Sequence, residues 1–254
     1  MFNFGRFALC IAFGVVLLGT TKLAPRVSGQ NLDYLPFSRS LLRPFPLKRI
    51  GLPGDLISGR TLTVADIQVV EEKSAGIENE SDSESIHHLA FSGRNIYGTS
   101  WSVKAQAGNY YESFYTGDID RNGKSDVILA IGTGGNGLAP TTRLIFLTFD
   151  RKGDPTIFEG TGYYQTGPNG ILDVADLDRD GRAELVHMLF DDGYWITNVY
   201  RVRNSRWSLV RGRFANMSFP LYTRFTIRPN HKPVKPRRGR NPVAPNLLKK
   251  TARQ

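Results

Sequence analysis

The sequence DIDRNGKSD at residues 118–126 returns 58 residues later as DLDRDGRAE at residues 176–184. Both copies fit the pattern D-x-D-x-[DN]-G-x-x-[DE], and each runs directly into an apolar segment, residues 127–131 and 185–189. Side-chain oxygens at alternate positions can converge when the backbone wraps around a hard cation, and glycine at the sixth position permits the sharp turn. The repeat therefore predicts cation-binding loops on a modular β architecture.

The loop chemistry indicates calcium, which takes about six to eight oxygen ligands at about 2.3–2.6 Å. An EF-hand is argued against, because its bidentate glutamate at position 12 is replaced by Leu129 and His187 and because the flanks are strand-like rather than helical. The alternative is a pair of plain acidic turns that bind no ion, since Asp-Gly loops are common between strands. Position 7 of such a loop offers only its backbone carbonyl, and it holds Lys124 and Arg182.

The segments 116–130 and 174–186 resemble FG-GAP/VCBS-type repeats, the calcium-loop repeats of integrin-like β-propellers. The resemblance covers roughly residues 100–210 and implies a partial propeller, because the chain has too few repeats for about seven blades. It also implies that loop positions 1, 3, 5 and 9 supply side-chain oxygens to calcium. Those positions are Asp118, Asp120, Asn122 and Asp126 in the first copy, and Asp176, Asp178, Asp180 and Glu184 in the second.

Strand patterns dominate the rest of the chain, and we predict an all-β fold of antiparallel, blade-like repeats over residues 61–228. The expected strands and hairpins cover residues 61–70, 88–92 with 96–105, 143–149, 156–160, and 194–201 with 206–211 turning at Asn204 and Ser205. The fragment GTGGNG at residues 132–137 matches G-x-G-x-x-G, but Pro140 and a strand follow it. Because a dinucleotide site needs a helix there, we interpret the fragment as a loop.

The N-terminus predicts export. Arg6 precedes an apolar stretch at residues 7–19, which is short for a membrane span, and small residues around Gly29 fit signal peptidase cleavage. We therefore predict a signal peptide over residues 1–29, with an uncleaved anchor as the alternative, and a secreted, periplasmic or cell-surface protein. Residues 30–60 read as a linker or irregular lead-in. Cys10 is the only cysteine, so the mature domain would depend on its core or on metal rather than on disulfides.

Most of the net charge of +10 lies in one appendage, and residues 1–30 add +3 through Arg6, Lys22 and Arg26. Nine lysines and arginines and no acidic residue occur from Arg228 onward, whereas residues 31–227 sum to −2. Residues 229–254 are predicted to be a basic, Pro-rich disordered tail. Such a tail can bind an anionic polymer or remain inert.

Together these patterns favour a calcium-binding β-repeat protein with a structural or adhesion-like binding role, whose partner is a protein or glycan at the cell surface. One alternative is an extracellular hydrolase acting on a glycan or an ester. Glu112, Glu159 and Asp173 are its candidate carboxylates, but no spacing pairs them, so we expect no enzyme activity. The other alternative is anionic-surface binding through the tail. Specific nucleic-acid binding is not expected, and membrane contact is expected only if the N-terminal segment is uncleaved.

Overall fold

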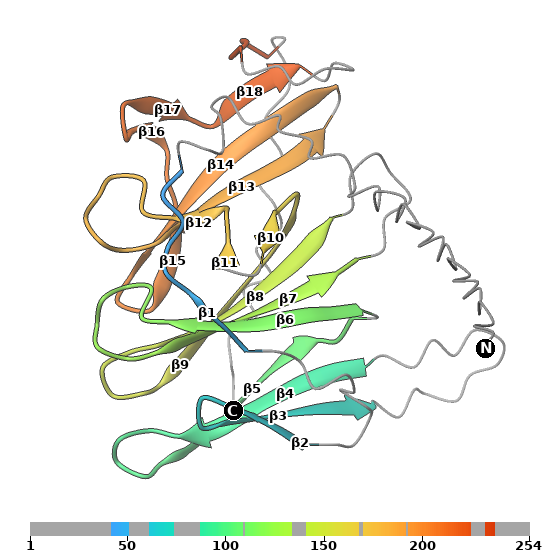
Figure 1. The fold of residues 1–254 in the computed structure, drawn as a ribbon, viewed down its shortest axis with the longest axis vertical. Helices are drawn as coiled ribbons and strands as arrows, with labels where there is room; N and C mark the ends of the chain where they lie inside the picture. The colour runs from blue at the N-terminus through green and yellow to red at the C-terminus, as the bar shows by residue number, and fades with distance from the viewer. Residues whose placement is uncertain are drawn as a thin grey trace, which may run out of the picture.

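The computed structural model describes residues 42–50, 61–73, 87–108, 110–133, 141–167, 170–191, 193–224 and 232–236. These residues form 18 strands and no helix, and the strands pair antiparallel in open sheets (Figure 1). The predicted all-β, antiparallel class is confirmed. Within the described ranges, no helix is long and apolar enough to cross a membrane.

Three sheets make up most of the fold. The lower sheet contains β2 (Thr61–Val64), β3 (Ile67–Lys73), β4 (His87–Arg94) and β5 (Ser100–Gln106) in that order. The middle sheet has the order β1 (Lys48–Ile50), β6 (Tyr110–Gly117), β7 (Asp126–Gly132), β8 (Thr142–Phe149) and β9 (Pro155–Gly162). The upper sheet contains β12 (Val174–Ala175), β13 (Glu184–Asp191), β14 (Tyr194–Arg203) and β15 (Arg206–Leu209), and β18 (Leu221–Arg224) also pairs with β14.

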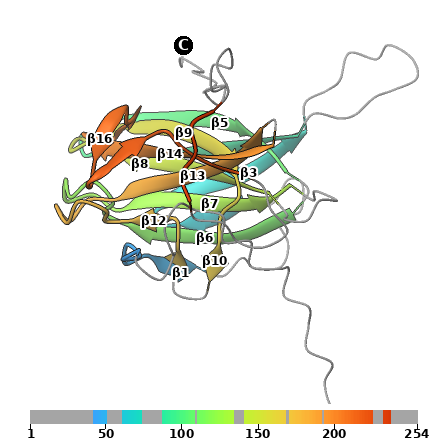
Figure 2. The same ribbon diagram turned by 90° about the horizontal axis from the view of Figure 1, so that it is seen from above.

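Four consecutive strands follow one another in each sheet, because each turn returns the chain beside the strand it has just left. Two short hairpins complete the fold, β10 (Thr166–Gly167) with β11 (Gly170–Ile171), and β16 (Gly212–Phe214) with β17 (Met217–Phe219). The lower, middle and upper sheets lie one after another along the long axis (Figure 1), and their strands run in similar directions when seen from above (Figure 2).

The middle sheet is covered on both faces. One apolar cluster joins it to the lower sheet, with Leu89 and Phe91 packed against Leu129. A second cluster joins it to the upper sheet, where Phe158 stacks on Trp207 with ring centroids 5.2 Å apart. Burial on both sides explains why β7 is a continuous apolar run rather than an alternating one. Each large apolar side chain buried here stabilises the fold by about 1.5–3 kcal/mol.

Every second turn of the three sheets lies at the same end of the molecule, on the left in Figure 1. The hairpin turns at Ala65–Asp66, Asn204–Ser205 and Ala215–Asn216 each have two successive residues with positive φ. This backbone matches the right-handed twist of the flanking strands, so it closes two-residue hairpins without splaying them. The end that carries these turns also carries both acidic loops.

Three stretches differ from the sequence-based expectations. Residues 61–70 form a hairpin rather than one strand, because Ala65 and Asp66 both take left-handed conformations, which alanine rarely adopts and aspartate tolerates. The lead-in expected to be irregular contains β1, which pairs with β6. Inside the basic tail, Val234 donates its amide to the Tyr222 carbonyl at 2.8 Å, so residues 232–236 run along β18. The predicted signal peptide, the G-x-G-x-x-G fragment apart from its first two residues, and the rest of the tail lie outside the described residues.

Candidate metal centre

The two acidic loops lie side by side at the turn end. The first loop, residues 118–126, joins β6 to β7, and the second loop, residues 176–184, joins β12 to β13. Arg121 Nη1 donates to the Asp180 carbonyl at 3.3 Å, and Arg182 Nε donates to the Asp120 carbonyl at 3.1 Å. Each loop thus sends an arginine to the backbone of the other. These contacts join the middle and upper sheets through the loops themselves.

The backbone conformation of the loops is repeated as closely as their sequence. The fourth residue has positive φ in both, 58° at Arg121 and 64° at Arg179, and so does the sixth, Gly123 and Gly181. The first aspartate of each loop accepts the amide of that glycine, at 2.9 Å in the first loop and 3.0 Å in the second. The same turn is therefore built twice from the same capping interactions.

In both loops the predicted ligands at positions 1, 3 and 9 converge. The convergent groups are Asp118, Asp120 and Asp126 in one loop and Asp176, Asp178 and Glu184 in the other, and within each triad one oxygen of each carboxylate lies within 4.8 Å of the others. The fifth position is engaged differently. Asn122 Oδ1 accepts the amide of Lys124 at 2.8 Å, and Asp180 Oδ1 accepts the amide of Arg182 at 2.9 Å.

The first loop uses its carboxylates to bind backbone amides. Both oxygens of Asp118 accept amides of the loop itself, from Asn122 and Gly123. Asp126 is fully buried, and its two oxygens accept the amides of Ile119 at 3.0 Å and Phe149 at 2.9 Å.

Asp120 extends the same pattern to a distant turn. Its Oδ1 accepts the amide of Asn122 at 3.2 Å, and its Oδ2 accepts the amide of Ser205 in the β14–β15 turn at 2.6 Å. Every carboxylate oxygen of the first triad therefore already has a backbone donor.

The second loop leaves two oxygens without donors. Glu184 is fully buried and its Oε2 accepts the amide of Leu177 at 2.9 Å, but its Oε1 has no partner in the described part of the chain. Asp176 Oδ1 is likewise buried and unpartnered there. A buried polar atom without a partner costs about 1–3 kcal/mol, and more when it is charged. A hard cation supplies the interaction these two oxygens lack, so the second loop fits a calcium ion.

Burial raises the pKa of the ninth residue in both loops. Removal from water raises the pKa of Asp126 to about 8, with Asp120 and Asp118 adding to the rise and its two backbone donors opposing it. Burial also raises the pKa of Glu184 to about 7, and the charges of Asp178 and Asp180 add to that rise. A dication beside either carboxylate would favour the ionised form and lower its pKa.

Three arginines lie close to the acidic side chains at the edge of the second loop. Arg203 Nη2 lies 2.6 Å from Asp180 Oδ2, Arg182 Nη1 lies 3.5 Å from the same oxygen, and Arg201 lies 3.8 Å from Asp178. Asp180 is therefore an arginine partner rather than a member of the convergent triad, although the family resemblance implied a ligand. Sequence reasoning missed Arg201 and Arg203. Their i, i+2 spacing on the last residues of β14 places them on one face, which was the only signal in the sequence.

The carboxylates considered for a hydrolase have other contacts. Glu112 is 3.4 Å from the Thr142 hydroxyl and 3.1 Å from the Thr166 hydroxyl. Asp173 is fully buried and accepts the amide of Gln165 at 2.7 Å.

Comparison with protein-family models, curated proteins and solved structures found no match for the chain.

Proposed function

We propose that the chain is an exported calcium-binding β-repeat protein in which one ion, held by the second loop, stabilises the junction between the middle and upper sheets. The observation that carries the proposal is the pair of buried, unpartnered oxygens on Asp176 and Glu184. Both residues belong to the triad Asp176, Asp178 and Glu184, in which one carboxylate oxygen of each residue lies within 4.8 Å of the others.

The blade-like arrangement is part of the same proposal. Three sheets made of consecutive antiparallel strands, stacked face to face with the loops at one end, are what a fragment of a propeller would give. A calcium ion at the second loop would fix the short β12 to β13 and would order the loop from which Arg182 reaches the Asp120 carbonyl. The protein's role in this proposal is structural or adhesive, with no catalytic step.

Calorimetric titration of the full chain with calcium tests the proposal, after prior removal of metal with chelator. We expect one ion per chain and a higher melting temperature in millimolar calcium, because a ligand that binds the folded state raises stability. Asp176→Asn should abolish both effects. The matched variant Asp118→Asn should retain both, because the oxygens of the first triad already have amide donors. Absence of binding heat together with an unchanged melting curve would reject the calcium proposal.

A further inference from the structure

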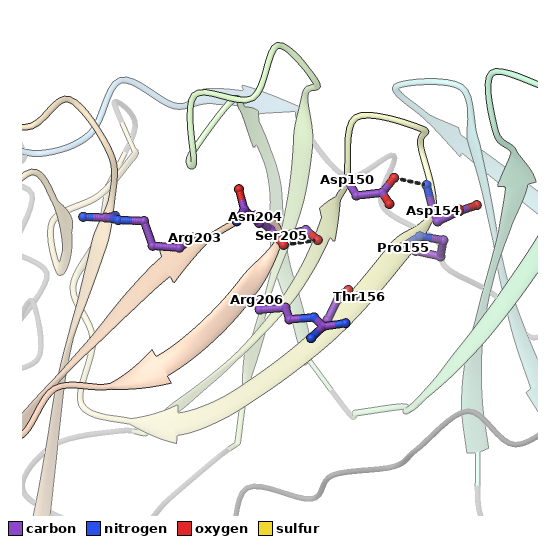
Figure 3. A pocket seen from close by; sticks show the side chains of 8 residues that line it. All are labelled: Asp150, Asp154, Pro155, Thr156, Arg203, Asn204, Ser205 and Arg206. Carbon is purple, nitrogen blue, oxygen red and sulfur yellow. Dashed lines mark hydrogen bonds between the residues drawn. The ribbon is translucent and has the colours of Figure 1, made fainter.

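A pocket of about 500 Å³ opens at the turn end, beside the first loop (Figure 3). Its walls are the β8–β9 turn, residues 150–154, with the start of β9, and the β14–β15 turn, residues 203–206. One wall therefore belongs to the middle sheet and the other to the upper sheet. The volume lies within the range of small-molecule sites, about 300–1,000 Å³.

Both walls are held in place by hydrogen bonds. Ser205 donates its amide to Asp120 Oδ2 at 2.6 Å, and its carbonyl accepts from the buried Thr148 hydroxyl at 2.5 Å. In the opposite turn, Asp150 Oδ1 accepts the amides of Lys152 at 2.8 Å and Asp154 at 3.0 Å. A ligand would meet a preformed surface and would lose little affinity to ordering the protein.

Side chains of the first loop bind the backbone at both walls of this pocket. Asp120 holds the β14–β15 turn, as described above. Asn122 and Asp126 hold the residue before the other turn, because the Phe149 carbonyl accepts from Asn122 Nδ2 at 2.5 Å and its amide donates to Asp126 Oδ1 at 2.9 Å. The side chains expected to surround an ion in the first loop thus position the two walls of a pocket.

The pocket offers donors and acceptors of both charges. Asp150 uses Oδ1 for the amides of its own turn, and within the described part of the chain its Oδ2 accepts no hydrogen bond, so it can accept one from a ligand. Asp154 points away from the facing wall in Figure 3 and accepts from Asn95 Nδ2 at 2.9 Å. Asn204 and Arg206 supply donors on the facing wall. Arg203, the last residue of β14, extends away from the other lining residues in Figure 3. Its side chain binds Asp180 of the second loop and is not available to a ligand in the pocket.

We propose that this pocket binds a neutral sugar unit of a glycan. Vicinal hydroxyl groups both donate and accept, so they can satisfy carboxylate, amide and guanidinium groups together. An anion would face the carboxylate of Asp150, whereas a cation would face the guanidinium of Arg206. The inference rests on the proposed binding role and names its ligand class and its site.

Saturation-transfer NMR and calorimetry of the full chain test this site. The probes are lactose, maltose, cellobiose and chitobiose, with sulfate and arginine methyl ester as charged probes. We expect at least one disaccharide to bind and neither charged probe to do so. Arg206→Ala should weaken sugar binding about tenfold or more, because a hydrogen bond that involves a charged group contributes about 1.5–3 kcal/mol and 1.4 kcal/mol is tenfold. Asn204→Gly should weaken it less, about two- to tenfold, because a hydrogen bond between neutral groups contributes about 0.5–1.5 kcal/mol. Glycine keeps the left-handed turn that Asn204 adopts at φ 49°.

Arg151→Ala is the matched control, since Arg151 is exposed in the same β8–β9 turn but does not line the pocket. It should leave sugar binding unchanged. Failure of every disaccharide to bind, preference for sulfate or the arginine ester, or equal weakening by Arg151→Ala and Arg206→Ala would each overturn the inference. The two proposals fail separately, because calcium uptake without sugar binding rejects only this site and sugar binding without calcium uptake rejects only the calcium proposal.

Discussion

The first and second loops share a sequence pattern, a backbone conformation and a place at the same end of the fold, yet they use their carboxylates differently. In the first loop, Asp126 and Asp120 accept amides from Phe149 and Ser205, which lie 23 and 85 residues further along the chain. In the second loop, Asp176 and Glu184 each keep one buried oxygen without a donor. The comparison teaches that a ligand pattern fixes where oxygens converge, whereas neighbouring backbone donors decide what those oxygens bind.

The largest effect should come from exchanging the ninth residue of each loop. Asp126→Ala removes the acceptors of two buried amides, and each amide left unpaired costs about 1–3 kcal/mol, so we expect a loss of about 2–6 kcal/mol. Glu184→Gln keeps an acceptor for the Leu177 amide and removes a buried charge, so stability in chelator at pH 8 should stay level or rise. Urea unfolding with and without calcium measures both.

Asp126→Asn is the milder companion, should the alanine variant fail to fold. It retains one acceptor oxygen and should lose roughly half as much stability. If Glu184→Gln lowers the free energy of unfolding in chelator as much as Asp126→Ala does, the inferred difference between the two loops is wrong.

The next effect concerns pH in the absence of calcium. The folded-state pKa values of Asp126, about 8, and Glu184, about 7, lie above the ordinary values of 3.8 and 4.5, so the folded protein binds more protons than the unfolded chain between about pH 4 and 8. Stability should be greatest near pH 4 as far as these two groups are concerned, and their contribution should be lost as pH rises through 7 and 8.

Urea unfolding of chelator-treated protein across this pH range measures how the free energy of unfolding changes with pH. Glu184→Gln should remove the part between about pH 4.5 and 7, and millimolar calcium should offset the same part, because the ion favours the ionised carboxylate. A stability that rises with pH over this range in chelator would contradict the assignment.

The smallest expected effect is a difference in stability between alanine substitutions at the two loop glycines, Gly123 and Gly181. Gly123→Ala and Gly181→Ala both place alanine at positive φ, which costs about 1 kcal/mol or slightly more. A Cβ at Gly181 would also collide with Nη1 of Arg121, whereas nothing lies near a Cβ at Gly123. Gly181→Ala should therefore cost more, and the excess should vanish in an Arg121→Ala background. Equal costs in the parent protein would show that the arginine moves aside freely.

Features that depend on interactions within a few residues could be predicted from the sequence. The convergence of loop positions 1, 3 and 9, the strand at residues 143–149 and the turn at Asn204–Ser205 follow from spacing, apolar runs and turn composition. The hairpin at residues 61–73 did not, because alanine rarely adopts the positive φ of Ala65, and Asp66 lacks the glycine that usually accompanies aspartate in such a turn.

The partners of the loop side chains also escaped prediction. Ser205 lies 85 residues from Asp120, and no pattern in the sequence joins them. Likewise, Asp180 fits a ligand position by spacing, but Arg203 reaches it from the end of β14. Competition between a cation and arginines or amides is decided by tertiary packing, which spacing does not encode.

The bond between Asp120 and Ser205 has a consequence for the order of events during folding. Synthesis proceeds from the N-terminus, so the first loop emerges long before the hairpin that supplies one of its amide donors. Until β14 and β15 form and dock, Asp120 Oδ2 faces water, and the first loop holds only the hydrogen bonds that its own residues and β8 supply. The last sheet made thus completes a loop in the sheet before it, and the two mature together rather than in sequence.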